Sequence, residues 1–289
     1  MPEHTLTGNI QSHPNFPSRT LGNARDVLVY LPPDYRRSRT RQYPVLYLHD
    51  GQNIFDAATA FGGVEWGADE TAQRLANQKL IEPLIIVAVA NTGEQRIHEY
   101  APTRGRLEAG KRRRSKGLLR HYGGFLINDL KPFIDARYRT LTSAEHTGLG
   151  GSSLGGLATL VLGLWFPNVF QRLAVMSPSI WWDNCAIYDM VEELDEEARP
   201  PLKIWLDTGT KEPGWERARI LRDGLLEKGW RLHDDLHYLE AEGADHSERA
   251  WAQRLEAVLR FLFPPPPPIV QGARRRSKPA VIRQTPLIV

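Results

Sequence analysis

The most informative stretch of the sequence is Gly148-Leu-Gly-Gly-Ser-Ser-Leu-Gly-Gly-Leu157. Its central residues, 151–155, fit G-x-S-x-G, a pattern typical of a serine held on a sharp turn between a strand and a helix. Only Ser153 has glycine both two positions before it and two positions after it, because the residue two after Ser152 is Leu154. Glycine removes the Cβ atoms that would collide in so tight a turn. The pattern fits a nucleophilic serine, but an ordinary glycine-rich loop would look the same.

The segments around this turn alternate between strand and helix patterns. Short apolar runs predict strands at 24–32, 43–49, 84–90, 170–176, 202–207 and 236–241, and a glycine-diluted strand at 144–150. Helical spacing predicts helices at 66–79, 125–138, 154–166, 215–228 and 247–263. Together with the serine turn, this alternation predicts an α/β-hydrolase fold, a doubly wound and mostly parallel sheet with helices on both faces.

The length of 289 residues suits a single large α/β domain. We interpret residues 1–23 as an N-terminal lead-in with room for one edge strand, 24–263 as a single α/β-hydrolase domain, and 264–289 as a Pro-rich, basic, disordered tail. Cys185 is the only cysteine, which excludes an internal disulfide and a cysteine-based zinc site. The sequence has neither a secretory leader pattern nor a run of the roughly twenty apolar residues that span a membrane. We therefore expect a cytoplasmic protein without a membrane partner.

The net charge of +3 comes from the C-terminal tail. The tail contains five basic residues and no acidic ones, namely Arg274, Arg275, Arg276, Lys278 and Arg283. Without them, the 37 basic and 34 acidic residues of the chain become 32 and 34. A near-neutral domain argues against a nucleic-acid partner, which would require a basic face on the folded part.

The acid and base that a serine nucleophile needs follow it in the chain in α/β-hydrolases, first the acid and then the histidine. The histidines beyond any plausible acid are His233, His237 and His246. The first two belong to a strand pattern without a following Glu, so we expect no metal site there. His246 follows a strand and a glycine-containing loop, which suits a general base. Of two candidate acids, Glu212 on a loop is preferred for its reach, and Asp207 at a strand end is the alternative.

The remaining candidates are predicted to surround the serine. Donors for an oxyanion are expected from the N–H of Leu154 and from the loop after strand 43–49, where Gln52 is the best candidate and Gly51 the next. Trp181 and Trp182 follow strand 170–176 and are either core residues or an aromatic wall for a substrate. The basic stretch 104–116 is either a solvated loop or an electropositive rim that attracts an anionic substrate.

Four sets of residues together resemble the enterochelin esterase-like, or esterase D-like, putative esterase family of α/β-hydrolases. They are 43–53 (Tyr-Pro-Val-Leu-Tyr-Leu-His-Asp-Gly-Gln-Asn), 96–102 (Arg-Ile-His-Glu-Tyr-Ala-Pro), 148–157 with Ser-Pro-Ser-Ile-Trp-Trp at 177–182, and Gly-Thr-Lys-Glu at 209–212 with His246. The resemblance covers roughly residues 15–263. Members of this family include siderophore esterases, feruloyl and acetyl-xylan esterases, S-formylglutathione hydrolases and mycolyltransferases.

The resemblance implies roles for individual residues. Ser153 matches the nucleophile, His246 the base and Glu212 the acid of the family's G-T-x-D/E motif, while Gln52 follows the Asp-Gly where an oxyanion N–H is expected. Arg96 matches a family residue near the site, paired there with Glu99, whose role is structural or substrate-facing.

We therefore predict a serine carboxylic-ester hydrolase that works through an acyl-enzyme on a small-molecule ester, without metal or cofactor. Trp181, Trp182 and Arg96 are the candidate substrate-binding residues. The alternatives are an acyltransferase, a feruloyl or acetyl carbohydrate esterase, and a non-catalytic binding module with the same fold. The sequence does not specify the oligomeric state.

Overall fold

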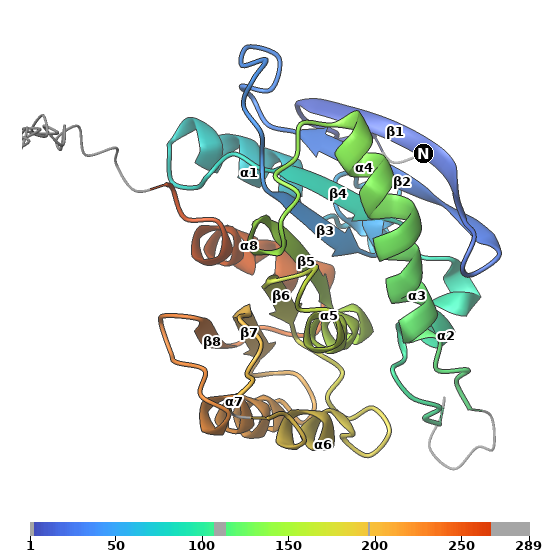
Figure 1. Ribbon diagram of the computed structural model, residues 1–289, viewed down its shortest axis with the longest axis vertical. Helices are drawn as coiled ribbons and strands as arrows, with labels where there is room; N and C mark the ends of the chain where they lie inside the picture. Colours follow the sequence, from blue (N-terminus) through green and yellow to red (C-terminus); the bar gives the residue numbers. More distant parts are fainter. Residues whose placement is uncertain (1–2, 107–113, 196, 267–289) are drawn as a thin grey trace, which may run out of the picture.

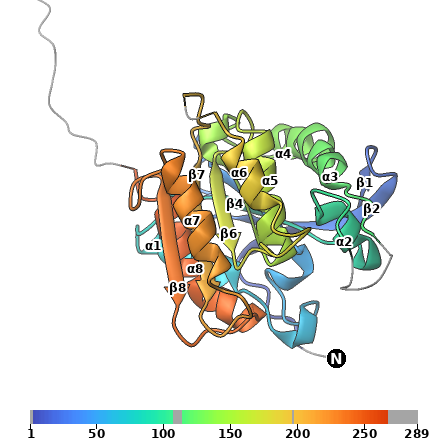
Figure 2. The same ribbon diagram turned by 90° about the horizontal axis from the view of Figure 1, so that it is seen from below.

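The computed structural model of the chain describes residues 3–106, 114–195 and 197–266. Its strands form one eight-stranded sheet in the order β1-β2-β4-β3-β5-β6-β7-β8 (Figure 1). The strands are β1 (Asn9–Ser18), β2 (Asn23–Leu31), β3 (Val45–His49), β4 (Ile85–Val89), β5 (Thr147–Ser152), β6 (Arg172–Met176), β7 (Lys203–Gly209) and β8 (Leu236–Ala241). Strands β3 to β8 are parallel, and β1 and β2 add antiparallel pairings at one edge, opposite β8 (Figure 2). The predicted mostly parallel α/β-hydrolase fold is confirmed.

Helices cover both faces of this sheet (Figure 1). They are α1 (Ala68–Asn77), α2 (Arg96–Tyr100), α3 (Leu119–Phe125), α4 (Lys131–Arg137), α5 (Leu154–Trp165), α6 (Ile187–Glu192), α7 (Arg217–Glu227) and α8 (Glu248–Leu262). Buried side chains of α1 and α8 join one core cluster, and those of α2 to α7 join the other. The two clusters lie on opposite faces of the sheet, as a doubly wound arrangement requires.

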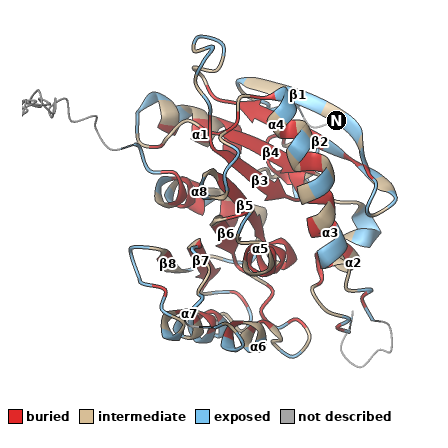
Figure 3. Cartoon of the chain, in the orientation of Figure 1, coloured by how far each residue is buried: buried red, intermediate tan, exposed pale blue. Residues whose placement is uncertain are grey.

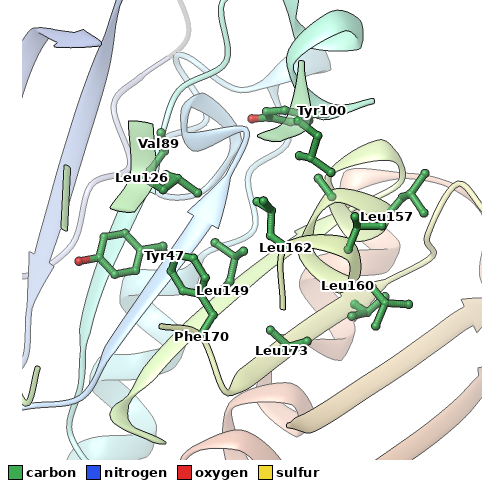
Figure 4. Packing of buried hydrophobic residues seen from close by; sticks show 14 of the residues in the cluster. Tyr47, Val89, Tyr100, Leu126, Leu149, Leu157, Leu160, Leu162, Phe170 and Leu173 are labelled. Atoms are coloured by element: carbon green, nitrogen blue, oxygen red, sulfur yellow. The ribbon is translucent and has the colours of Figure 1, made fainter. Parts of the chain in front are cut away.

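The central strands are buried on both faces (Figure 3). Because side chains alternate along a strand, Val45 and Tyr47 of β3 belong to one core cluster and Leu46 and Leu48 to the other. Figure 4 shows the larger cluster, in which Tyr47 lies beside Leu149 and Phe170. This two-sided burial explains why β3 appears in the sequence as a continuous apolar run.

The structure differs from the predicted elements in its short helices. Neither α2 nor α6 was predicted, because helices of five and six residues are too short to display a helical period. The helix predicted at 125–138 begins earlier, as α3, and reaches α4 through a π-helical turn at Leu126–Leu130. Pro132 is the second residue of α4, which directly follows this π-helical turn, so its missing N–H falls where the regular α-helical hydrogen bonding is interrupted.

The ends of the predicted domain are only partly described. Strand β1 lies within the predicted lead-in and pairs with β2. Most of the predicted tail, 267–289, and residues 107–113 of the basic stretch lie outside the described residues. Within the described ranges, no helix is long and apolar enough to cross a membrane. The domain boundaries and the cytoplasmic location stay predictions.

Candidate active site

The loops that leave the parallel strands meet at the carboxyl edge of the sheet, where ligands bind in open α/β folds. Ser153 follows β5 and adopts φ 57° and ψ −122°, a conformation that is rare and strained for a residue other than glycine. Its N–H donates to the Met176 carbonyl oxygen at 3.0 Å, which ties the turn to β6. The serine thus lies on a sharp strand-to-helix turn, as G-x-S-x-G predicts.

Two glycines make this turn possible. A Cβ on Gly151 would lie 3.0 Å from the carbonyl carbon of Gly155, and a Cβ on Gly156 would lie 2.6 Å from the Met176 carbonyl oxygen. The contacts of a Cβ on Gly155 would begin only at 3.4 Å. The tightest approach is therefore at Gly156, one residue beyond the glycine that the motif specifies.

The serine and the predicted base line the same cavity. This cavity has a volume of about 790 Å³, and its lining includes Ser153, His246, Asp50, Gln52, Arg96 and Glu248. His246 follows β8, and its Nδ1 lies 2.9 Å from Glu212 Oε2. The Ser153 hydroxyl lies 3.3 Å from Ser179 Oγ, and among the described residues no hydrogen bond joins it to His246. Hydrogen bonds of this kind often tighten only when substrate binds.

The two candidate acids have different partners. Glu212 Oε1 accepts hydrogen bonds from Ser177 Oγ at 2.6 Å and from the Gly209 N–H at 2.8 Å, which leaves Oε2 to His246. Asp207 is fully buried and accepts from the Ser177 N–H at 3.0 Å and from Trp205 Nε1 at 2.7 Å. Its nearest cation is Arg254, with 3.4 Å between Nε and Oδ2. This geometry favours Glu212 as the partner of His246.

The pKa values of these carboxyl groups shift in opposite directions. Burial raises the pKa of Glu212, but hydrogen bonds from His246, Ser177 and Gly209 outweigh it, and the net shift is downward. For Asp207, burial dominates over the attraction of Arg254 and raises the pKa to about 6. Glu212 is consequently the carboxyl group more readily kept ionised.

The predicted oxyanion donors, Leu154 and Gln52, belong to the turns that follow β5 and β3. Leu154 is the first residue of α5, so its N–H belongs to the unpaired first turn of a helix, where the helix dipole favours negative charge. Gln52 lines the cavity from the turn after β3. A Cβ on Gly51 would lie 2.5 Å from the Val89 nitrogen, so glycine allows this turn to press against the end of β4.

Arg96 and Glu99 face different partners. Arg96 lines the cavity and forms a two-pronged ion pair with Asp50, at 2.6 Å from Nε to Oδ1 and 2.7 Å from Nη2 to Oδ2. Glu99 is buried against Arg25, with 3.0 Å between Oε2 and Nη1. The contacts of Glu99 are therefore structural. Arg96 faces the cavity, and its positive charge is balanced there by Asp50.

Trp181 and Trp182 have different surroundings, although they are adjacent in the sequence. Trp182 is 1% exposed and donates from Nε1 to Thr103 Oγ1 at 3.1 Å, so it is a core residue and its assignment to substrate binding is corrected. Trp181 is 53% exposed and lines a second cavity of about 380 Å³ together with Trp215 and Ile180. His246 lines both cavities, so the predicted base lies between a charged pocket and an aromatic one.

The larger cavity is lined by both positively and negatively charged side chains. Its lining contains Arg96 and Arg249 but also the carboxylates Asp50, Asp245 and Glu248. Burial and the nearby Asp50 raise the pKa of Glu248 to about 6, although hydrogen bonds from Trp66 and Asn53 oppose the shift. None of the described residues of the basic stretch, 104–106 and 114–116, lines this cavity. The electropositive rim stays a prediction.

Sequence reasoning missed several polar residues at this edge. Ser177 and Ser179 contact Glu212 and Ser153, and Asp50 holds Arg96. Their position was the available signal, because Asp50 and Ser177 directly follow a strand at the carboxyl edge and Ser179 lies two residues further on. What each hydroxyl or carboxylate contacts depends on residues far away in the chain, which no local pattern specifies.

Potential metal ligands lie elsewhere. Glu65, Asp69 and Glu70 offer carboxylate oxygens within 4.8 Å of one another beside the start of α1, and none of them is among the lining residues of the larger cavity. Burial, together with Glu70, raises the pKa of Asp69 to about 8, so the group also suits a shared proton. His237 stacks on Trp205, with 4.3 Å between the ring centres.

Comparisons with known proteins identify the family of the chain. The profile of the family described as "Putative esterase" matches residues 18–262. The chain is 24% identical over 248 residues to the uncharacterized protein YbbA of Bacillus subtilis, covering 84% of this chain and 93% of that protein. It is 27% identical over 183 residues to the ferri-bacillibactin esterase BesA of the same organism, covering 59% of this chain and 60% of that protein. The crystal structure of the BES protein from Bacillus cereus superimposes with a TM-score of 0.67 at 24% identity, covering 91% of this chain and 98% of that one. The resemblance inferred from the motifs is confirmed, and the chain belongs to the putative esterase family of ester-hydrolysing enzymes.

Proposed function

We propose that the protein is a serine carboxylic-ester hydrolase in which Ser153, His246 and Glu212 act as nucleophile, base and acid. One observation carries this proposal: His246, hydrogen-bonded to Glu212 at 2.9 Å, lines the cavity into which the strained turn presents Ser153. Nucleophile, base and orienting acid are the parts that acyl transfer through an acyl-enzyme requires.

The reaction proceeds in two stages. His246 accepts the proton of the Ser153 hydroxyl as Oγ attacks the ester carbonyl, and Glu212 stabilises the resulting imidazolium. The N–H groups of Leu154 and Gln52 hold the oxyanion. The tetrahedral intermediate then expels the alcohol, which receives the proton from His246. Water, activated by His246, attacks the acyl-enzyme and releases the carboxylic acid and free Ser153.

The substrate is proposed to be a small-molecule ester of the siderophore type, by analogy with the relative named ferri-bacillibactin esterase. The exposed Trp181 beside the second cavity suits an aromatic group on one side of the scissile bond. A feruloyl or acetyl ester of a carbohydrate fits the same surface and is the main alternative. A panel of catecholate lactones, feruloyl esters, acetylated sugars and short p-nitrophenyl esters distinguishes these classes by kcat/KM.

A fluorophosphonate probe tests the nucleophile directly. Wild-type protein should be labelled covalently, and Ser153→Ala should lose both labelling and ester turnover. Ser152→Ala is the matched control, because it removes the adjacent serine but leaves G-x-S-x-G intact. Unlabelled wild-type protein would exclude this function and favour a non-catalytic binding module. Undiminished labelling of Ser153→Ala would exclude Ser153 as the nucleophile.

Acyl transfer is a second candidate, favoured by one observation. His246 lines cavities on two sides, so an alcohol could reach the acyl-enzyme in place of water. Turnover with an added alcohol or sugar acceptor separates the two reactions: a transferase forms mainly the new ester, whereas a hydrolase forms mainly the free acid.

A further inference from the structure

The segment Ser177-Pro178-Ser179, which follows β6, contacts both the nucleophile and the acid of the proposed triad. The Ser179 N–H donates to the Ser153 carbonyl oxygen at 2.9 Å, and the two hydroxyl oxygens lie 3.3 Å apart. Two residues earlier, Ser177 Oγ lies 2.6 Å from Glu212 Oε1. This short segment thereby connects a residue that follows β5 with one that follows β7.

The Ser177 hydroxyl has partners for all of its hydrogen-bonding capacity. Trp251 Nε1 donates to it at 3.0 Å and Arg254 Nη2 donates to it at 2.9 Å, both from α8. A serine hydroxyl has two lone pairs and one proton. With both lone pairs occupied by groups that can only donate, the proton is left for Glu212 Oε1. The direction of this hydrogen bond is therefore fixed by its surroundings.

The environment makes this arrangement hard to replace. Ser177, Trp251 and Arg254 are each at most 5% exposed, so water has little access to take over their hydrogen bonds. The Ser177 backbone has φ 41°, an uncommon conformation for serine, and its N–H is held by Asp207 Oδ1 at 3.0 Å. Backbone and side chain of one residue thus contact both buried carboxylates.

We infer that Ser177 is a positioning residue of the triad. Its hydroxyl proton and the Gly209 N–H occupy Glu212 Oε1 and so direct Oε2 to His246 Nδ1. Trp251 and Arg254 orient that hydroxyl. This inference rests on the proposed function, because positioning of Glu212 matters for turnover only if His246 is the base.

The test removes the hydroxyl in two ways. Ser177→Ala keeps the unusual φ occupied by a residue with Cβ, whereas Ser177→Gly relieves it, so the two variants differ in stability but share the loss of the proton. Both should lower kcat about tenfold with KM within twofold, because the interaction is made to the catalytic machinery and not to the substrate. Ser177→Cys, a weak donor, should give an intermediate kcat.

A spectroscopic readout separates positioning from general damage. In wild-type protein the proton between His246 Nδ1 and Glu212 should give a downfield NMR resonance, which moves upfield or broadens by exchange in Ser177→Ala and Ser177→Gly. Thr147→Val is the matched control: it deletes a buried hydroxyl bonded to the Ser143 carbonyl oxygen at the opposite end of β5. That control should leave kcat and the resonance unchanged.

The outcomes separate this inference from the proposed function. An active wild type whose Ser177 variants keep wild-type kcat and resonance would overturn the positioning role. A wild type that reacts with no fluorophosphonate would overturn the proposed function, while the resonance would still report on Glu212. If both hydroxyl-free variants fail to fold, Trp251→Phe replaces them as the test, because it retains the Ser177 hydroxyl but removes one donor that orients it. This variant should lower kcat about threefold. An unchanged kcat would contradict the inference.

Discussion

Two buried carboxylates at the end of β7 lie five residues apart and have different surroundings. Asp207 is enclosed by Trp205, the Ser177 N–H and Arg254, and burial raises its pKa to about 6. Burial of Glu212 is outweighed by three hydrogen bonds, so its pKa is lowered. The comparison shows that burial alone does not identify a catalytic acid. What distinguishes Glu212 is its set of donors to the ionised form and one oxygen left to the imidazole.

The largest expected effect comes from neutralising each carboxylate in turn. Glu212→Gln should lower kcat/KM by about 10³- to 10⁴-fold, because a neutral amide does not stabilise the imidazolium of His246. Asp207→Asn should lower it less than about tenfold, since its carboxylate reaches the site only indirectly, through Ser177 and Arg254. Steady-state turnover of a p-nitrophenyl ester measures both. A larger loss in Asp207→Asn than in Glu212→Gln would reverse the assignment of the acid.

The next effect concerns Arg254, the counter-ion of Asp207. Arg254→Met should destabilise the fold by about 3–5 kcal/mol, because it leaves the buried Asp207 carboxylate without its cation. Thermal unfolding at pH 8 should show a decrease in Tm of roughly 10 °C.

The double variant Arg254→Met with Asp207→Asn provides the control for this prediction. It removes the unpaired charge and should recover part of the lost Tm. If the double variant were as unstable as the sum of the single variants, the ion pair would not be the cause.

The proposed role of Glu212 could be predicted from the sequence, whereas the difference between its surroundings and those of Asp207 could not. Chain order and the strand-end position of the loop placed Glu212 and His246 at the edge that Ser153 also occupies. The donors that separate the two carboxylates come from Ser177 and Arg254, which are 35 and 42 residues away from Glu212 in the sequence. Long-range contacts of this kind depend on how α8 packs on the sheet.

A signal for Arg254 was nevertheless present. In α8 the buried apolar positions include Trp251, Leu255 and Val258, and Arg254 falls on the same stripe. A cation on the apolar face of a helix requires a buried anionic or hydrogen-bonding partner. For the burial of Trp182 the sequence contained no such signal, because two adjacent tryptophans have the same local pattern whether they are buried or exposed.

The smallest expected effect is the pH dependence of stability, where the two carboxylates should act in opposite directions. The pKa of Asp207 is about 6 in the folded state and 3.8 in the unfolded chain. Between these two pH values the folded state therefore binds more protons than the unfolded state. Its contribution to the free energy of unfolding therefore decreases as the pH rises from about 4 to 6. Glu212 has a folded-state pKa below 4.5, so its contribution is present above pH 4.5 and is lost as the pH falls through the folded-state value.

Thermal unfolding between pH 3.5 and 8 tests these opposite slopes. Asp207→Asn should remove the decrease in stability between pH 4 and 6. The Tm of this variant should therefore rise relative to that of wild type across this window, where each kcal/mol corresponds to about 2–4 °C. Glu212→Gln should instead lose the gain in stability that wild type shows as Glu212 ionises, below pH 4.5. Because each prediction concerns a change with pH, it is independent of any constant cost of the substitution itself. Parallel Tm curves for wild type and both variants would show that neither carboxyl group has a shifted pKa, and the contrast between the two sites would then rest on hydrogen-bond geometry alone.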